Sequence, residues 1–277
     1  MDTMAFTKMH GIGNDFVIID HRRDPRPLSR DRVRAIADRR TGVGCDQLIL
    51  IENPVDEHAD AFMRIYNTDG SEAEACGNAT RCVASILMTE AASRQTVIET
   101  VAGLLDAEAA ENGLVAVDMG PANLDWRDIP LSEAADTLHV GIGSGPLQDP
   151  VAVNMGNPHA VFFVDDAEAV DLSLHGPRLE RHAMFPEFAN IGVAAVTGEN
   201  VIRLRVWERG VGETLACGSG ACAAVVAASR RGLGGRRASV NLNGGTLEIH
   251  WQPDNRVMMT GPVAVSFSGV LDGALTA

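Results

Sequence analysis

Short segments in which apolar and polar residues alternate recur in both halves of this chain. Met63–Tyr66 and Leu204–Trp207 follow this period-two pattern, which predicts β-strands because successive side chains of a strand point to opposite faces. Further short strands are predicted at residues 97–100, 114–117, 240–242, 246–249 and 256–259. The chain is therefore expected to be rich in sheet.

A longer run of helical character follows each of these two segments, at residues 78–88 and 219–229. The second run is apolar nearly all round, which predicts a helix that is buried on all sides. It ends in Arg230, Arg231 and Gly232, and helix C-termini favour such cations followed by glycine. A sheet-rich chain with one such helix in each half fits the α+β class better than a regular βαβ series.

The chain repeats itself once when Cys76 is aligned with Cys217. Without a gap, the alignment superposes Arg64 on Arg205, Tyr66 on Trp207, Glu72 on Glu213 and Ala75 on Ala216. A Gly-Pro pair follows each cysteine at the same interval, as Gly120-Pro121 and Gly261-Pro262, and a Gly-Asn pair precedes each, as Gly13-Asn14 and Gly156-Asn157. Agreement at four places predicts two similar halves.

This repeat predicts an α+β fold of two pseudo-symmetric domains, each a mixed, mainly antiparallel sheet wrapped around a central helix. With 277 residues, the chain is also in the range where one core usually divides into more than one domain. The expected domains are residues 1–121 together with a return strand at 265–277, and residues 122–264.

Composition narrows the possible partners. The net charge is −14, so the surface repels phosphate backbones and nucleic acid is an unfavourable partner. Lys8 is the only lysine, which leaves almost no choice for Schiff-base chemistry with pyridoxal phosphate. No apolar stretch approaches 18 residues and the N-terminus lacks a signal-peptide pattern, so no membrane partner and a cytoplasmic location are expected.

The interleaved Arg and Asp residues of 22–40 are expected to form a solvated helix face.

The cysteines do not form a recognised metal or redox spacing. Their odd number, five, argues against a disulfide framework, and the absence of a C-x-x-C pair argues against common zinc sites, so no metal site is expected. Cys45, Cys82 and Cys222 are interpreted as small packed residues.

Cys76 and Cys217 differ because each precedes a predicted helix. A helix N-terminus offers free N–H groups and partial positive charge, which can lower a thiol pKa from about 8.5 to roughly 3.5–7.5 and also bind a carboxylate. Gly77 and Gly218 allow close approach of a ligand to the backbone. Two such thiols suit the inversion of a carbon centre without a cofactor, since one removes a proton and the other adds one to the opposite face.

An ordered set of motifs over about residues 4–265 resembles the diaminopimelate epimerase family. The motifs are 9–16 (MHGIGNDF), 44–47 (GCDQ), 66–71 (YNTDGS), 75–78 (ACGN), 156–159 (GNPH), 207–210 (WERG) and 213–220 (ETLACGSG). The resemblance implies a cofactor-independent interconversion of LL- and meso-2,6-diaminopimelate in lysine and peptidoglycan biosynthesis, and a homodimer. Cys76 and Cys217 match the two catalytic thiols, and His159 and Glu208 match their acid–base partners. The matched substrate-binding positions are Asn14, Gln47, Asn67, Gly77, Asn78, Asn157, Asn190, Arg209, Gly218 and Ser219.

Two other interpretations stay open. A two-lobed amino-acid binder would keep the Asn and Arg residues without needing paired thiols. A racemase of another amino acid on the same fold would also use two cysteines, although Asn67, Arg209 and the motifs favour diaminopimelate. Ala79 stands where the family pattern has glycine, and its methyl group is tolerated only if the local backbone is helical.

Overall fold

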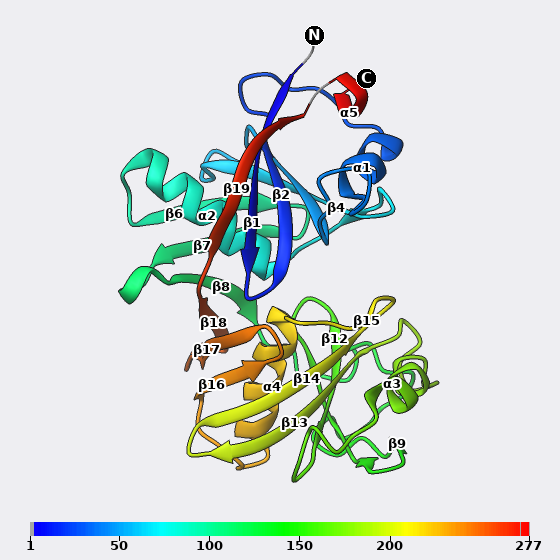
Figure 1. Cartoon of the computed structure of the whole chain (residues 1–277). Coiled ribbons are helices and arrows are strands. Elements are labelled where there is room, and N and C mark those ends of the chain that lie inside the picture. Colours follow the sequence, from blue (N-terminus) through cyan, green and yellow to red (C-terminus); the bar gives the residue numbers. More distant parts are fainter. Residues whose placement is uncertain (1–2, 272, 277) are drawn as a thin grey trace. The chain divides into compact units, whose positions relative to one another are not determined.

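The computed structural model describes residues 3–271 and 273–276. The chain folds into two compact units (Figure 1): unit 1 contains the residues up to Val117 and those from Gly261 onward, and unit 2 contains Asp118–Thr260. Residues 1 and 2 of the first expected domain, and residues 272 and 277 of the expected return strand, lie outside the described residues. No helix within the described ranges is long and apolar enough to cross a membrane.

Unit 1 is built on a mixed sheet. Its strands are β1 (Met4–Gly11), β2 (Asn14–Asp20), β3 (Gln47–Glu52), β4 (Ala61–Asn67), β5 (Glu72–Ala73), β6 (Gln95–Thr100), β7 (Gly103–Ala109), β8 (Val115–Pro121, which runs into unit 2) and β19 (Ala264–Leu271). The pairs β2–β3 and β4–β6 are parallel. The pairs β1–β2, β3–β4, β4–β5, β6–β7, β7–β8 and β1–β19 are antiparallel.

Unit 2 follows the same order of pairings. Its main strands are β11 (Val151–Asn154), β12 (Pro158–Phe163), β13 (Asn190–Gly198), β14 (Val201–Glu208), β15 (Gly212–Glu213), β16 (Arg237–Leu242), β17 (Gly245–Trp251) and β18 (Arg256–Gly261). The pairs β12–β13 and β14–β16 are parallel, and β11–β12, β13–β14, β14–β15, β16–β17 and β17–β18 are antiparallel. Parallel pairing occurs at the same two steps in both units. A separate hairpin joins β9 (Gly143–Ser144) and β10 (Leu147–Gln148).

One long helix packs against the sheet of each unit. α2 (Gly77–Ala91) contacts β1, β2, β6 and β7, and α4 (Gly218–Arg230) contacts β11, β12, β13, β14, β16 and β17. Residues 220–228 of α4 are all buried, as expected from their apolar composition. The predicted α+β fold of two pseudo-symmetric sheet-and-helix domains is confirmed.

The helix expected at residues 22–40 is largely wrong. Only α1 (Arg30–Ala37) is helical, capped by Ser29, whose Oγ accepts from the N–H of Arg32. Pro25 and Pro27 precede it, and residues before proline disfavour helix. The remaining helices of the described ranges are α3 (Leu172–Glu180), the 3₁₀ turn η1 (Glu111–Gly113) and the short α5 (Gly273–Thr276).

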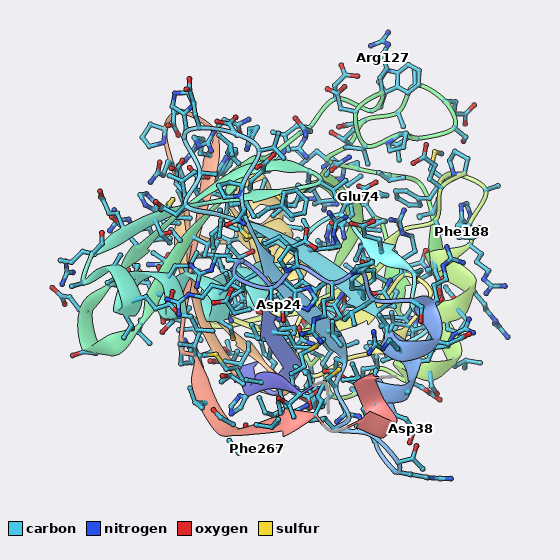
Figure 2. All side chains as sticks on the ribbon, turned by 90° about the horizontal axis from the view of Figure 1, so that it is seen from above. Asp24, Asp38, Glu74, Arg127, Phe188 and Phe267 are labelled. Atoms are coloured by element: carbon cyan, nitrogen blue, oxygen red, sulfur yellow. The ribbon has the colours of Figure 1, made fainter. Side chains whose placement is uncertain are left out.

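Three apolar side chains of β19 are exposed to solvent. Val265, Phe267 and Val270 are 61%, 50% and 62% exposed, and Figure 2 shows Phe267 at the edge of the ribbon. The Phe267 ring packs edge-on against Phe6 of the neighbouring β1, with ring centroids 5.9 Å apart. These side chains leave uncovered apolar area on unit 1.

Candidate active-site residues in each unit

Cys76 is the N-cap residue of α2, and its side chain makes no capping hydrogen bond. Its backbone is extended, while the following Gly77 and Asn78 begin the helix. The N–H groups of the first helical turn have no partner within the helix, so Gly77 and Asn78 are placed where an anion can be bound. Ala79 is buried inside α2 with helical backbone, so its methyl group causes no strain there.

Asn14 joins Cys76 to Asn78 in unit 1. The Cys76 thiol donates to Oδ1 of Asn14 at 3.8 Å, and Nδ2 of Asn78 donates to the same oxygen at 3.1 Å. Asn14 is the first residue of β2, whose parallel neighbour β3 begins with Gln47. Gln47 donates to Oδ1 of Asn67 at 3.1 Å. The predicted residues of unit 1 therefore form one cluster around Cys76 and one pair at the start of β3.

Cys217 has the equivalent position in unit 2. It is the N-cap of α4, also without a side-chain capping bond, and it is 3% exposed. Its Sγ lies 3.7 Å from Oγ of Ser219, and that hydroxyl lies 3.1 Å from Nε2 of His159. The same Nε2 lies 2.8 Å from Oδ1 of Asn157. Because this amide oxygen can only accept, Nε2 carries the ring proton of His159.

Burial keeps the His159 ring neutral. Desolvation, aided by the positive charge of Arg209, lowers the pKa of His159 to about 3. With the proton on Nε2, the other ring nitrogen, Nδ1, is a buried acceptor that has no hydrogen-bond partner among the described residues. At neutral pH the His159 ring is therefore uncharged, and it acts on its neighbours as a hydrogen-bonding group.

The expected lowering of the Cys217 pKa is wrong. Burial raises the pKa of the Cys217 thiol well above its usual value, and the negative charge of Glu208 raises it further. Hydrogen bonds from Gly220 and Ser219 act in the opposite direction but are smaller. Loss of solvent outweighs these hydrogen bonds, so Cys217 rests as a thiol.

Glu208 and Arg209 follow one another at the end of β14 and have separate anchors. Thr214 donates through its hydroxyl to Glu208 at 2.5 Å. The Arg209 backbone N–H donates to Oδ1 of Asn190 at 2.9 Å, and its guanidinium donates to the carbonyl of Glu187 at 3.0 Å. Asn190 is 2% exposed and also donates to the carbonyl of Pro158 at 3.1 Å. In this structure both ends of its amide are bound to backbone, and a role as substrate ligand stays a prediction.

The other cysteines are buried, as predicted. Cys45, Cys82 and Cys222 are 1%, 0% and 0% exposed. Burial raises the pKa of Cys45 to about 11 and that of Cys82 to about 12. Thiols of this kind are poor nucleophiles at neutral pH.

Glu180 was not indicated by any sequence pattern. It ends α3, is 4% exposed, and accepts from the indole N–H of Trp207 at 2.7 Å and from the N–H of Gly210 at 3.0 Å. It therefore fixes the chain on both sides of Glu208 and Arg209. In sequence, Glu180 looks like an ordinary carboxylate at the end of an amphipathic helix, which is normally solvated. Only its burial in the folded structure identifies it as a positioning residue.

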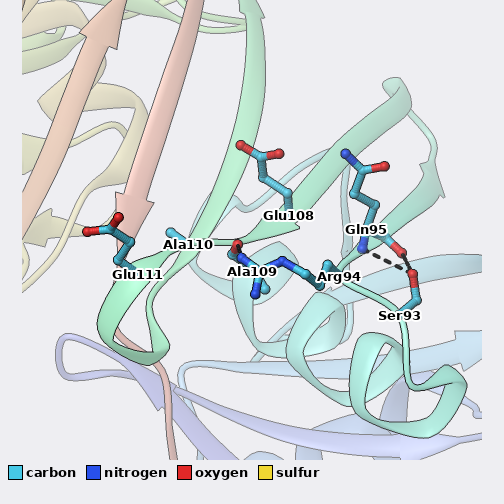
Figure 3. A pocket seen from close by; sticks show the side chains of 7 residues that line it. All are labelled: Ser93, Arg94, Gln95, Glu108, Ala109, Ala110 and Glu111. Atoms are coloured by element: carbon cyan, nitrogen blue, oxygen red, sulfur yellow. Dashed lines mark hydrogen bonds between the residues drawn. The ribbon is translucent and has the colours of Figure 1, made fainter.

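Within the described ranges no group of three or more His, Cys, Asp or Glu side chains is arranged to hold a metal ion. A surface hollow of unit 1 lies where the turn before β6 meets the end of β7 (Figure 3). It is lined by Ser93, Arg94, Gln95, Glu108, Ala109, Ala110 and Glu111, and these differ from the predicted site residues.

Solved structures define the class of this fold. A phenazine biosynthesis protein of the PhzF family from Bacillus anthracis matches with a TM-score of 0.71 and 17% identity over 98% of this chain and 100% of that chain. A hydroxyproline epimerase from Agrobacterium vitis matches with a TM-score of 0.68 and 17% identity over 98% of this chain and 91% of that chain. At such identities the likeness shows the fold: two similar sheet-and-helix units.

Sequence comparison then gives the family. The family model described as "Diaminopimelate epimerase" matches residues 6–124 and 151–265. Proteins named diaminopimelate epimerase from Rhodospirillum centenum and Acidiphilium cryptum are 60% and 57% identical to this chain; each alignment covers 98% of it, and 93% and 98% of the relative respectively. The chain belongs to the diaminopimelate epimerase family.

Proposed function

We propose that this protein interconverts LL- and meso-2,6-diaminopimelate through two thiols, Cys76 and Cys217, without a cofactor. The observation that carries the proposal is the repeated placement of a cysteine at the N-cap of the helix packed on each sheet. An inversion needs one group to remove the α-proton and another to deliver a proton to the opposite face. The names of the relatives supply the substrate, and lysine and peptidoglycan synthesis are the pathways that it serves.

The environments of the two thiols support different roles. Cys217 is buried beside Glu208, with a pKa raised by burial, which favours the proton-donating thiol. Cys76 is only partly buried and takes the proton from the LL form in this proposal. Glu208 and His159 set the protonation of these thiols. Backbone N–H groups at Gly77-Asn78 and Gly218-Ser219 hold the reacting carboxylate. One such donor typically stabilises a transition state by about 2.7–4 kcal/mol.

Recognition of the remote amino-acid end is assigned to polar side chains. A guanidinium binds a carboxylate in a bidentate manner, so Arg209 is proposed to bind the distal carboxylate. Asn and Gln side chains both donate and accept, which suits a group bearing ammonium and carboxylate. Asn14, Gln47, Asn67, Asn157 and Asn190 are proposed for these contacts.

The decisive experiment follows the α-proton. The protein is incubated under reducing conditions with LL-diaminopimelate in deuterated water, and α-deuteration and formation of the meso form are measured.

Cys76→Ala and Cys217→Ala are each expected to slow turnover at least about 100-fold, since a positioned acid or base typically contributes that much. Cys82→Ala, in the same helix as Cys76, serves as the matched control and is expected to stay active. Absence of exchange by the unchanged protein refutes the proposal and leaves a non-catalytic binder, whereas exchange of proline but not diaminopimelate indicates a related racemase.

A homodimer is the proposed assembly, and the exposed apolar side chains Val265, Phe267 and Val270 of β19 support it. Light scattering of the wild-type protein and of Phe267→Asp tests it, because a charge in a paired apolar surface is costly. A monomeric wild-type protein rejects this part of the proposal. The boundary at residues 121 and 122 and the cytoplasmic location stay predictions.

A further inference from the structure

The side-chain amide of Asn14 is hydrogen-bonded to the carboxylate of Asp46. Its Nδ2 donates to Oδ2 of Asp46 at 2.9 Å, while its Oδ1 accepts from Cys76 and from Asn78. A carboxylate can only accept hydrogen bonds. The amide of Asn14 is therefore fixed in one of its two possible orientations, with the oxygen on the side of the thiol.

Asp46 is itself fixed by reciprocal contacts with its neighbour Asp15. The N–H of Asp15 donates to Oδ2 of Asp46 at 3.1 Å, and the N–H of Asp46 donates to Oδ1 of Asp15 at 3.0 Å. The guanidinium of Arg39 bridges both carboxylates, at 2.8 Å from Asp46 and 2.6 Å from Asp15. These contacts leave the Asp46 carboxylate little freedom to turn away from Asn14.

The sole lysine completes this network. Lys8, whose side chain is 8% exposed, pairs with Asp15 at 2.5 Å and donates to the carbonyl of Gly44. Burial alone raises the pKa of Asp15, but hydrogen bonds from Arg39 and Lys8 outweigh it and lower that pKa to about 2. Asp15 is thus ionised at all physiological pH values; it is paired with Lys8 and Arg39, and Asp46 is paired with Arg39.

We propose that Asp46 is a positioning residue, which orients the Asn14 amide so that Cys76 and the substrate meet a hydrogen-bond acceptor and not a donor. This inference rests on the proposed function for its kinetic consequence, but its structural part concerns Cys76 alone. An acceptor next to the sulfur favours the S–H form, whereas an N–H donor there would favour the thiolate. When a substrate enters, the same oxygen is suited to its ammonium group, which displaces the S–H donor and leaves Cys76 to act as the base of the proposed function.

The test removes the acceptor that Asp46 provides. In Asp46→Ala no side chain at this position accepts from Nδ2 of Asn14, so the Asn14 amide is free to turn its Nδ2 toward the sulfur. Two quantities are measured on the full chain: kcat/KM for LL-diaminopimelate, and the rate at which iodoacetamide alkylates Cys76 at neutral pH, read by mass spectrometry of the Cys76 peptide. We expect kcat/KM to fall about tenfold, the size of one lost hydrogen bond, and Cys76 to be alkylated several-fold faster.

Two further variants separate orientation from general damage. Arg39→Gln removes the cation that holds both carboxylates but keeps the Asp46–Asn14 hydrogen bond, so changes below about threefold, smaller than the loss of one hydrogen bond, are expected in both quantities. Asp46→Asn keeps an oxygen toward Asn14, because the N–H of Asp15 needs an acceptor at the same position, so its Cys76 alkylation rate is expected to stay close to that of the wild type. Asp46→Glu, which misplaces the carboxylate by one methylene and keeps the charge, is used as well, and circular dichroism checks that every variant is folded.

The proposal is overturned if Cys76 of folded Asp46→Ala is alkylated within about twofold of the wild-type rate, since the loss of one hydrogen bond changes a rate by more than that. It is equally overturned if Arg39→Gln reproduces both effects, because the network would then act only by stabilising the loop. A wild-type protein that does not convert diaminopimelate refutes the proposed function, while the alkylation measurements still decide the orientation of Asn14.

Discussion

The side-chain oxygen of Asn190 accepts a hydrogen bond from the backbone N–H of Arg209 at 2.9 Å. The same amide donates to the carbonyl of Pro158, so one buried side chain connects the residue before His159 to the segment that carries Arg209. Both segments hold proposed site residues of unit 2. Their relative position therefore depends on an amide that sequence comparison alone would assign to the substrate.

Asn190→Ala is expected to destabilise the protein by roughly 1–3 kcal/mol, because it leaves two backbone groups without their buried partner. Urea denaturation measures this loss. Asn241→Ala, on a half-exposed position of β16, is the comparison and is expected to change stability by less than about 0.5 kcal/mol. Equal effects of the two changes would show that the Asn190 bridge contributes little.

Glu180→Gln is expected to raise KM more than it lowers kcat. The neutral amide retains one acceptor for the two donors, Trp207 Nε1 and Gly210 N–H, so the segment bearing Arg209 becomes less well placed for binding the distal carboxylate. Steady-state kinetics with LL-diaminopimelate checks this. Glu199→Gln, at an exposed turn of the same unit, controls for loss of charge, and an unchanged KM in Glu180→Gln would argue against the positioning role.

His159 is expected to make folding stability depend on pH. Its folded pKa, about 3, lies below the unfolded value of about 6.5, so the unfolded state binds the proton first. The stabilising effect of this neutral ring is present above about pH 6.5 and is lost as the pH falls from there toward 3, with a slope of at most about 1.4 kcal/mol per pH unit. Urea midpoints at several pH values are compared between wild type, His159→Gln and the exposed-histidine variant His58→Gln. The slope should weaken in His159→Gln alone.

Cys76 is expected to be alkylated before every other cysteine of the native protein. It is the partly exposed thiol among the described cysteines, whereas burial raises the pKa of Cys45, Cys82 and Cys217. Peptide mapping after brief iodoacetamide treatment measures the order. Modification of Cys82 or Cys45 at a comparable rate without denaturant would contradict the burial described here.

The family and the candidate residues were readable from sequence because they depend on order and local pattern. The alternating segments at Met63–Tyr66 and Leu204–Trp207 became strands β4 and β14, and the runs after Cys76 and Cys217 became α2 and α4. Even the tolerance of Ala79 follows from local helical backbone. Segments that contain proline were less predictable. The Arg/Asp pattern of residues 22–40 suggested one helix, but because Pro25 and Pro27 disfavour helix before them, only α1 is helical.

The chain by itself determined that two similar sheet-and-helix units each place a cysteine at a helix start, since backbone propensity and hydrophobic period are local properties. Only the tertiary structure decided the chemistry of those thiols, because desolvation and hydrogen bonding depend on neighbours distant in sequence. Burial beside Glu208 keeps Cys217 protonated, where its helix position alone predicted a thiolate. The contact from Asp46 to Asn14 likewise fixed which end of an amide faces Cys76.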